Sequence, residues 1–500
     1  MFKKLLIANR GEIAVRIIRA ACEMKIQTVA VYSECDRLAL HVRHADEAYM
    51  LGPSPALESY LDIEKILFIA TSNGCDAVHP GYGFLAENPE FARRCQERNL
   101  IFIGPSAESM ELMGEKVVAR RTASQAGVPI VPGTNTILED IGQTEESARD
   151  IGYPLMVKAV SGGGGKGMRL VLSPKELKSA LRDAQSEAKA AFGNASVYLE
   201  KFIQSPRHIE IQVLADAHGN IVHLGERECS IQRRHQKVIE ECPSPLMTNE
   251  LRSQMGQAAI KIARKCSYKN AGTVEFIVDS KQNFFFLEMN TRLQVEHPTT
   301  EMVTGIDLVK RQIKVAAGET LDLQQQDICW RGSAIESRIY AEDPENEFSP
   351  SPGTIKKLQR PSGPGVREDS GIYEGYKVPI FYDPLLSKLV VWGENRCEAI
   401  RRMQQALGEY HISGITTNIS LLKSILNSDK FSSADLSTDF IEKHYHGVSP
   451  QPDEDSLKQV AIIASALFSS RIQQKDLSRF HKNESLWKLW GRWNGLRKWQ

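Results

Sequence analysis

The sequence has little cysteine and no close pairing of what it has. Its 9 cysteines are scattered over 500 residues, are odd in number and never stand as Cys-x-x-Cys. This pattern argues against a disulfide framework or a zinc ribbon and indicates reduced thiols in a cytosol. An excess of either charge is also missing, because 62 Lys and Arg balance 62 Asp and Glu. The chain therefore has no bulk attraction to nucleic acid or to a membrane surface, and any basic site must be local.

Long hydrophobic runs are lacking as well. No apolar stretch is long enough to span a bilayer. Lys3-Lys4 before the apolar residues 5–8 resembles the start of a signal sequence, but Asn9 to Glu12 ends that run too early. We therefore expect a soluble, cytoplasmic protein without a membrane span. What is present, 42% hydrophobic and 25% charged residues, is typical of a globular protein, and the length predicts about three domains.

The first 112 residues alternate between strand and helix patterns. The mostly apolar segments 3–8 and 28–32 predict buried strands, and helical spacing runs from Ile13 to Met24 between them. The alternation continues to residue 103, which predicts a doubly wound domain with a parallel sheet. The turns at residues 9–12 and 79–87 follow predicted strands, where such folds bind ligands. His79 in the second turn could be a ligand group, although such a histidine is more often structural.

Four consecutive glycines follow a predicted strand at residues 155–159. Directly after that strand stand Ser161, Gly162, Gly163, Gly164, Gly165, Lys166 and Gly167. Such a run can turn several backbone N–H groups onto one anion. It is neither a dinucleotide fingerprint, because a strand pattern follows at residues 168–172, nor a Walker A loop, which needs Ser or Thr after Lys166. The lysines that flank it, Lys158 and Lys166, favour a mobile hairpin over a triphosphate rather than a plain surface loop.

Two charged stretches leave alternatives open. Glu200-Lys201, on a predicted strand at residues 197–203, could contact an adenine or form an ordinary surface charge pair. Residues 233–237 (RRHQK) crowd cationic and titratable side chains together. Because acids follow at 240–241 and the chain is neutral, we favour a local anion site over a nucleic-acid face. Cys229 beside this cluster could have a lowered pKa, but we interpret it as structural.

Residues 284–301 (FFFLEMNTRLQVEHPTTE) begin as an aromatic strand and continue into functional groups. From Glu288 these groups stand at every second residue, which places them on one face of an extended chain: Glu288, Asn290, Arg292, Gln294 and Glu296. Acids beside an amide suit a hard divalent cation, and an arginine suits a planar oxyanion. We interpret the stretch as the floor of an active site; an exposed edge strand is the alternative, and a loop past Asn290 could present the same residues.

A neighbouring strand supplies another carboxylate. Residues 271–279 and 283–290 predict a hairpin whose pairing brings Glu275 toward Glu288. Two facing carboxylates repel unless a cation lies between them. We therefore predict Glu275, Glu288 and Asn290 as metal ligands, a set without the His and Cys of a zinc site.

Six motifs together carry a family resemblance: KKLLIANRGEIAVRIIRA from Lys3, HPGYGFLAEN from His79, KAVSGGGGKGMR from Lys158, ERECSIQRRHQKVIEECPSP from Glu226, FLEMNTRLQVEHPTTEM from Phe286 and SRIYAEDP from Ser337. Over residues 3–445 the sequence resembles the biotin carboxylase component of biotin-dependent carboxylases, an ATP-grasp enzyme. The resemblance implies that ATP and bicarbonate form carboxyphosphate, and that the N1′ atom of a biotin is then carboxylated.

The resemblance also implies individual roles. The expected ATP contacts are Lys116, Lys158, Gly162 to Gly167, Glu200, Lys201 and His208, with Gln232 and His235 as neighbours. Glu275 and Glu288 would bind the nucleotide through Mg²⁺ or Mn²⁺, with Asn290 as a further ligand and two metal sites expected. Bicarbonate would be held by Lys237, Arg292, Gln294, Val295 and Glu296. The catalytic set is then Glu296 as general base, Arg292, Lys237, and Arg338 as the biotin contact.

We expect four segments: a doubly wound domain at 1–112, an ATP-grasp domain at 113–330 with a lid over about 131–203, an α/β domain at 331–447, and a linker and tail at 448–500. Residues 456–471 are a candidate amphipathic helix. The last segment holds four of the chain's 6 tryptophans beside basic residues. It could anchor onto another protein or a membrane surface, or pack back on its own domain.

No Ala/Val-Met-Lys-Met biotinylation sequence occurs in these 500 residues. We therefore expect biotin carboxyl carrier protein and carboxyltransferase to be separate chains, held in part by the tail, and this chain to form a homodimer or a larger carboxylase complex. Acetyl-CoA, propionyl-CoA, a branched acyl-CoA, pyruvate and 2-oxoglutarate are all compatible acceptors, because the carboxyltransferase chooses. Two alternative functions are another ATP-grasp ligase that passes an acyl phosphate to an amine, and a non-catalytic scaffold, which the complete set of charged site residues disfavours.

Overall fold

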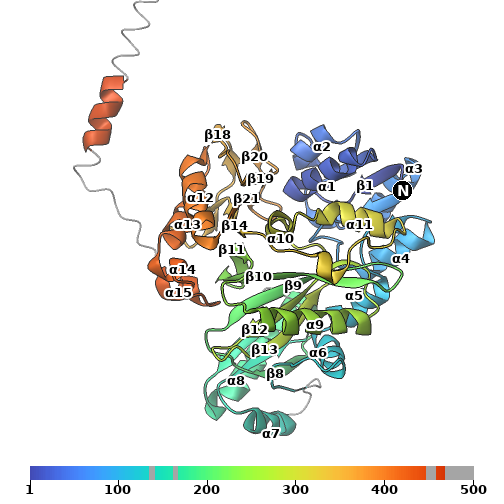
Figure 1. Cartoon of the computed structure of the whole chain (residues 1–500), viewed down its shortest axis with the longest axis vertical. Helices are drawn as coiled ribbons and strands as arrows, with labels where there is room; N and C mark the ends of the chain where they lie inside the picture. Colours follow the sequence, from blue (N-terminus) through green and yellow to red (C-terminus); the bar gives the residue numbers. More distant parts are fainter. Residues whose placement is uncertain (135–140, 161–166, 446–457, 468–500) are drawn as a thin grey trace, which may run out of the picture. The chain divides into compact units, whose positions relative to one another are not determined.

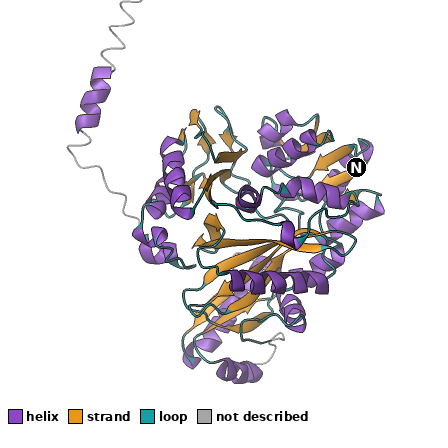
Figure 2. Cartoon of the chain, viewed as in Figure 1, coloured by secondary structure: helices purple, strands orange, loops and turns teal. Residues whose placement is uncertain are grey.

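The chain divides into two compact units, residues 1–446 and 447–500. The structure, a computed structural model, describes residues 1–134, 141–160, 167–445 and 458–467 (Figure 1). In the first unit, strands gather into sheets of five, eight and three strands, and helices pack around them (Figure 2). In the second unit residues 458–467 are helical. They lie within the helix predicted at 456–471.

The five-stranded sheet is parallel, with the order β3-β2-β1-β4-β5. Its strands are β1 (Lys4–Ile7), β2 (Gln27–Ser33), β3 (Glu47–Gly52), β4 (Ala77–His79) and β5 (Ile101–Phe102), connected through α1 (Gly11–Glu23), α2 (Leu40–His44), α3 (Ile63–Ser72) and α4 (Pro89–Glu97). Leu5 packs with Ile13 of α1, whereas its neighbour Leu6 packs with Ile66 of α3 and Phe91 of α4. Both faces of the sheet are therefore buried, which explains the unbroken apolar run and confirms the predicted doubly wound domain.

The strand order reverses between β1 and β4, and one amide connects the turns that follow them. Asn9 Nδ2 donates to the carbonyl oxygens of Pro80 and Tyr82, each at 2.7 Å. The backbone N–H of Gly81 donates to His79 Nδ1 at 3.0 Å. Burial lowers the pKa of His79 to about 3, so the ring is neutral. His79 is therefore a structural residue, the second of its two predicted interpretations.

The eight-stranded sheet is antiparallel, with the order β13-β12-β9-β10-β11-β14-β21-β19. Its strands are β9 (Arg207–Ala215), β10 (Ile221–Arg233), β11 (Gln236–Cys242), β12 (Asn270–Val278), β13 (Phe284–Asn290), β14 (Ser333–Tyr340), β19 (Val366–Ser370) and β21 (Leu385–Gly393). Helix α9 (Asn249–Lys265) lies along β9 and β10 (Figure 1), and its Met255 and Ile262 pack on Ile209 and Ile211. The alternate residues of β9 face away from α9.

The three-stranded sheet has the order β7-β6-β8 and consists of β6 (Leu155–Ala159), β7 (Met168–Val171) and β8 (Val197–Lys201), with α7 (Ile141–Ile151) and α8 (Leu177–Phe192). Leu155 and Val157 of β6 pack with Leu181 and Ala184 of α8. The strands predicted on both sides of the glycine run are thus confirmed. Ser161 to Lys166, including Gly162, Gly163, Gly164 and Gly165, lie outside the described residues, so their position over a triphosphate stays a prediction.

Strand β13 interrupts the simple alternation that its sequence suggests. Glu288 pairs with Glu275 but Phe286 pairs with Phe276, so Leu287 is an extra residue, a β-bulge. The bulge lets both Phe286 and Met289 enter the core. The strand then ends at Asn290, and residues 291–296 form a loop. The extended-chain prediction is wrong beyond Asn290, and the alternative of a loop is confirmed.

The other helices of the first unit are α5 (Ala107–Gly114), α6 (Lys116–Gln125), α10 (His297–Thr304), α11 (Leu308–Ala316), α12 (Arg396–Glu409), α13 (Ile419–Leu426), α14 (Asp429–Ser432) and α15 (Phe440–His444). Short strand pairs join β15 (Glu342–Asp343) to β16 (Ser349–Pro350), β17 (Gly353–Thr354) to β20 (Lys377–Val378), and β18 (Lys357–Gln359) to β22 (His411–Ser413). Across the described ranges, every helix falls short of the length and apolarity that crossing a membrane requires.

The pH dependence of stability tests the burial of His41 in α2. Burial lowers the pKa of this ring from 6.5 to about 4. The unfolded chain therefore binds more protons than the folded protein between these values, and the free energy of unfolding falls as the pH is lowered through them, by about 3 kcal/mol from this residue. Denaturant unfolding at pH 7 and pH 4 should show a smaller loss for His41→Gln than for the native protein.

The matched control is His411→Gln, which changes an exposed histidine. This variant should keep the native pH dependence. Equal losses of stability in His41→Gln and the native protein would contradict the assignment.

Candidate active site

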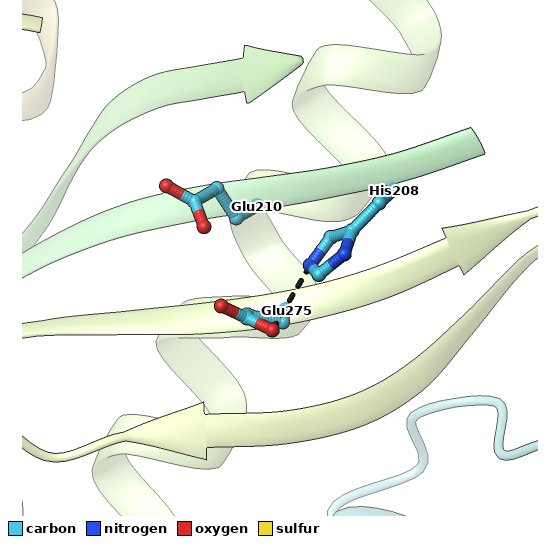
Figure 3. A group of neighbouring side chains, drawn as sticks. All are labelled: His208, Glu210 and Glu275. Carbon is cyan, nitrogen blue, oxygen red and sulfur yellow. Dashed lines mark ion pairs between the residues drawn. The ribbon is translucent and has the colours of Figure 1, made fainter. Parts of the chain in front are cut away.

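A row of carboxylates crosses three neighbouring strands of the large sheet. Glu210 of β9 pairs with Glu275 of β12, and Glu275 pairs with Glu288 of β13. Residues directly opposite each other on neighbouring strands lie about 5 Å apart at Cβ, and like charges in that position repel. Figure 3 shows His208 and Glu210 on one strand beside Glu275 on the next. This face of the sheet therefore needs cations.

Lys237 of β11 supplies one. Its Nζ donates to Glu275 at 2.8 Å, to Glu296 at 2.6 Å and also to Glu210. Burial alone would lower the pKa of Lys237, but these carboxylates raise it well above its ordinary value. Burial would likewise raise the pKa of Glu275, yet Lys237 and His208, whose Nε2 lies 2.9 Å away, hold it far below its usual range. The ligand atoms of His208, Glu210 and Glu275 lie within 4.8 Å of one another, a spacing that suits a metal, but a protein cation already neutralises this group.

The predicted metal ligands do lie together. Asn290 Nδ2 donates to Glu275 at 2.8 Å, and Glu288 is the register partner of Glu275. Burial and the charge of Glu275 raise the pKa of Glu288, against the opposing charge of Lys116. A divalent cation between the two carboxylates would remove this repulsion. Glu275, Glu288 and Asn290 therefore fit a hard cation.

Glu296 is the N-cap of α10 and lies between two cations. One carboxylate oxygen accepts from Lys237, and the other accepts from Arg338 Nη2 of β14 at 3.0 Å. Burial would raise the pKa of Glu296, but Lys237, Arg338 and Arg227 hold it well below its ordinary value. In this arrangement the carboxylate is ionised and weakly basic, so proton transfer to it requires a ligand that engages the same cations.

Arg292 and Gln294 hold the loop in front of Glu296. Arg292 donates to Glu87 at 2.9 Å and to Gln294 Oε1 at 2.9 Å, and Gln294 Nε2 donates to Glu275 at 3.2 Å. Val295, between Gln294 and Glu296, accepts a hydrogen bond through its carbonyl oxygen from Lys388 at 2.8 Å. The five residues predicted for bicarbonate thus meet at one place, with the Arg292 guanidinium still partly exposed.

One of the lysines predicted for ATP, Lys158, pairs with a buried acid. Glu200 of β8 is buried and pairs with Lys158 of β6 and with Arg120 of α6. The interpretation of Glu200-Lys201 as a surface charge pair is therefore wrong. Lys201 donates to the carbonyl oxygens of Gly152 and Tyr153, each at 3.1 Å. Lys116 begins α6, and burial together with the charge of Lys158 lowers its pKa.

The remaining predicted nucleotide residues divide into two groups. Gln232 Nε2 lies 2.7 Å from His208 Nδ1, so these side chains are joined beside Glu275. His235, by contrast, is exposed in the turn between β10 and β11, where Arg234 and His235 have φ values of 48° and 65°. Gly167 has φ +72°, and a Cβ there would lie 2.8 Å from that of Ala159. Only glycine fits that close approach.

Cys229 is fully buried, with Sγ 4.0 Å from Glu296. Burial and the charge of Glu210 raise its pKa well above the ordinary value, so the lowered pKa considered from the sequence is wrong and the structural interpretation holds. Several neighbours of the site were not predicted: Glu87, Arg120, Glu210, Arg227, Lys388 and Glu240, which pairs with Arg338. The alternation of His208, Glu210 and Gln212 on a predicted strand was the available signal for Glu210.

Three segments of the chain match models of known protein families, and its sequence is similar to that of known proteins. Residues 1–110 match the family model "Biotin carboxylase, N-terminal domain", residues 115–324 match "Carbamoyl-phosphate synthase L chain, ATP binding domain" and residues 336–443 match "Biotin carboxylase C-terminal domain". Biotin carboxylase 1 of Bacillus subtilis is 54% identical over 445 residues, which are 89% of this chain and 99% of that protein.

The chain is also similar to solved structures of biotin carboxylases. The biotin carboxylase domain dimer of the 2-oxoglutarate carboxylase from Hydrogenobacter thermophilus, in complex with MgADP, ADP and bicarbonate, superposes with a TM-score of 0.87 at 49% identity, covering 89% of this chain and 98% of that one. A biotin carboxylase subunit of pyruvate carboxylase superposes with a TM-score of 0.78 at 48% identity, covering 89% of this chain and 99% of that one. With three matching domain models and a relative of more than half identical sequence, the chain belongs to the biotin carboxylase family.

Proposed function

We propose that the chain carboxylates biotin, with ATP and bicarbonate as co-substrates and ADP and phosphate as products. The observation that carries the proposal is the buried Glu296 held between Lys237 and Arg338. A small oxyanion that enters beside Arg292 meets a cation at each end of this carboxylate. A buried acid costs free energy, whether or not cations compensate its charge. A scaffold has no use for such an acid, so the arrangement favours an enzyme.

The nucleotide would lie between the small sheet and the acid row. Lys116, Lys158 and the predicted Gly162–Gly167 loop would neutralise its phosphates, as several cations do in phosphoryl transfer. His208 and Gln232 form the joined pair at the edge of this region. Glu200 would act by holding Lys158, with which it forms an ion pair. Lys201 would brace the backbone at Gly152, and His235 would approach from its exposed turn.

Mg²⁺ or Mn²⁺ would be held by Glu275, Glu288 and Asn290, and two metal sites are expected. When bound, the metal supplies charge neutralisation of the transferring phosphoryl group. The pKa of Glu288 would change most on metal binding, because burial and the neighbouring carboxylate raise it in the metal-free protein. Glu275 also accepts from Lys237, so one side chain would serve both the metal and the anion.

Bicarbonate would be held by Lys237, Arg292, Gln294 and the Val295 backbone. Once Lys237 turns a donor toward the anion, Glu296 loses part of the charge that keeps its pKa low. Its basicity then rises where the bicarbonate proton must be removed. The anion attacks the γ-phosphorus and ADP leaves, which yields carboxyphosphate. Its C–O bond then breaks to CO₂ and phosphate, and the released phosphate would take the proton from biotin N1′. Arg338 would stabilise the oxygen of the deprotonated biotin as N1′ attacks CO₂.

The chain would act with a separate biotin carboxyl carrier protein and a carboxyltransferase, as a homodimer or in a larger carboxylase complex. Two similar structures, one from a 2-oxoglutarate carboxylase and one from a pyruvate carboxylase, support membership of such complexes. We further propose the division at residues 112, 330 and 447, with a lid over about 131–203. The matched segments 1–110, 115–324 and 336–443 support these bounds. The second and third segments nevertheless share one sheet, because the large sheet joins strands from both sides of residue 330.

Another ATP-grasp ligase is the second candidate, because the match of residues 115–324 is to a carbamoyl-phosphate synthase domain. Biotin dependence separates the two. ADP formation with bicarbonate should rise on addition of free biotin if the first proposal holds, and should respond to an amine instead if the second does.

Replacement of Glu296, the proposed base, should abolish the stimulation of ADP formation by biotin. Glu296→Gln keeps the shape of the side chain but removes the charge that accepts the proton, so biotin-dependent turnover should fall by roughly 10²- to 10⁴-fold. Arg338→Gln should also lower it. ADP release is measured with and without biotin. Lys430→Gln, which breaks an exposed ion pair with Asp435, is the control and should remain active. Full biotin-dependent turnover in Glu296→Gln would refute the assignment.

The metal assignment predicts opposite effects on stability and on activity. Glu288→Gln removes one of two facing carboxylates, so the metal-free protein should unfold at a higher temperature than the native protein. The same variant should need on the order of tenfold more Mn²⁺ or Mg²⁺ for half-maximal ADP formation. Glu97→Gln changes an exposed acid and should alter neither quantity. An unchanged metal requirement in Glu288→Gln would exclude this carboxylate as a ligand.

The tail is proposed to hold the partner subunits. Deletion of residues after 448 should leave ATP cleavage with free biotin intact, because every proposed site residue precedes that point. Assembly with the carrier and carboxyltransferase chains should weaken, which size-exclusion chromatography of the co-expressed chains measures. Assembly that equals that of the full chain would contradict a docking role.

A further inference from the structure

Behind the loop of residues 291–296 lies a lysine that the proposed mechanism does not use. Lys388 of β21 is the register partner of Arg338 of β14, and its side chain is 0% exposed. Its Nζ donates to the carbonyl oxygen of Val295 at 2.8 Å. Val295 directly precedes Glu296, so a cation from beyond residue 330 holds the backbone of the active-site loop.

The charge of this lysine is compensated on both sides. Glu12 Oε1 at the start of α1 lies 3.2 Å from Nζ, and Asp369 Oδ2 of β19 lies 3.9 Å away. Glu336, buried on β14, and the ring of Tyr82, with its centroid 5.9 Å from Nζ, complete the surroundings. Burying a lysine costs free energy before its partners compensate, and an apolar side chain would often be as stable. The lysine is therefore better explained by what it holds than by stability.

The Val295 carbonyl differs from the neighbouring carbonyls of the loop in where its hydrogen-bond donor comes from. Leu293 O accepts from Arg292 at 3.2 Å, Gln294 O lies 2.8 Å from His297 Nδ1, and Glu296 O accepts from Thr299. These bonds are local, whereas the donor to Val295 O comes from another strand and another segment of the chain. One peptide group contains the Val295 carbonyl and the Glu296 nitrogen. Lys388 thereby fixes the backbone from which the Glu296 side chain extends.

We propose that Lys388 is a positioning residue for the bicarbonate step. Arg338 and Lys388, neighbours on adjacent strands, hold two consecutive residues of the loop: Arg338 holds the Glu296 carboxylate, and Lys388 holds the peptide before it. Without the ammonium group, the Val295 peptide can rotate and Glu296 loses its alignment with the anion. The inference rests on the proposed function, since it assigns a part in that reaction.

Lys388→Met tests the role, because methionine keeps much of the length but removes the charge and the donors. Its kcat/KM for bicarbonate should fall at least tenfold, measured as biotin-dependent ADP formation. Its affinity for ATP should stay within twofold, because Lys158 and Glu200 lie on the small sheet. A loss shared equally by ATP binding and bicarbonate use would indicate general disruption and overturn the proposal, as would native kcat/KM for bicarbonate.

Removal of the ammonium leaves Glu12 and Asp369 partly uncompensated and could impair folding. The double variant Glu12→Gln/Lys388→Met, compared with Glu12→Gln alone, removes one of these charges and should show the same selective loss. Arg396→Met is the matched control: Arg396 also pairs with a buried acid, Glu241, and holds a backbone carbonyl, that of Phe431, at 2.7 Å. Its stability should fall, whereas its kcat/KM for bicarbonate should stay within twofold of the native value.

Native activity is measured first, so that the two proposals can fail separately. Absence of biotin- and bicarbonate-dependent ADP formation in the native protein would overturn the proposed function and this inference with it. Native activity combined with an unchanged Lys388→Met, or an unchanged double variant relative to Glu12→Gln, would overturn only the role of Lys388.

Discussion

The ion cluster of Lys237 with Glu210, Glu275 and Glu296 is the interaction on which the site depends. Removing one partner from a buried charge pair typically costs about 3–5 kcal/mol, because the other charge stays behind. The cluster is satisfied only when β9, β11, β12 and the loop after β13 are all in place. It therefore joins elements that are distant in the sequence, and a register shift of one residue in β9 or β12 would turn an acid into the apolar core.

The cations that stabilise the Glu296 carboxylate also weaken it as a proposed base, and substrate binding can change this balance. A general base works best with a pKa near the working pH, yet Lys237 and Arg338 keep Glu296 far more acidic. Lys237, one of the cations that suppress its basicity, is also one that a bicarbonate ion would engage. Under the proposed function, binding and activation would be coupled: the anion would draw a donor away from Glu296, and the proposed base would gain strength only where its substrate lies. Water, which lacks the anionic charge, competes poorly for these donors.

The local pattern of residues in the sequence predicted much of the fold and part of the site. The apolar runs of β1 and β2 and the hairpin of β12 and β13 followed from periodicity, and the hairpin brought Glu275 to Glu288 as expected. The bulge at Leu287 did not follow, because it depends on Phe286 and Met289 both packing into one core. Glu200 looked exposed beside Lys201, since its partners Arg120 and Lys158 come from other elements. Pairings of this kind arise from tertiary packing, which residue spacing does not encode.

The contribution of the segment after residue 330 follows from its place in the large sheet. β14 pairs with β11, and β21 pairs with β14, so Arg338 and Lys388 continue the same sheet that carries Lys237. Their side chains reach back to consecutive residues of one loop, a carboxylate and the peptide before it. Residues 113–330 alone would present Glu296 with one of its two cations and with an unheld peptide. The acid row could form there, but Glu296 would lack its final position, so the proposed anion site would be complete only when the last strands of the sheet have joined.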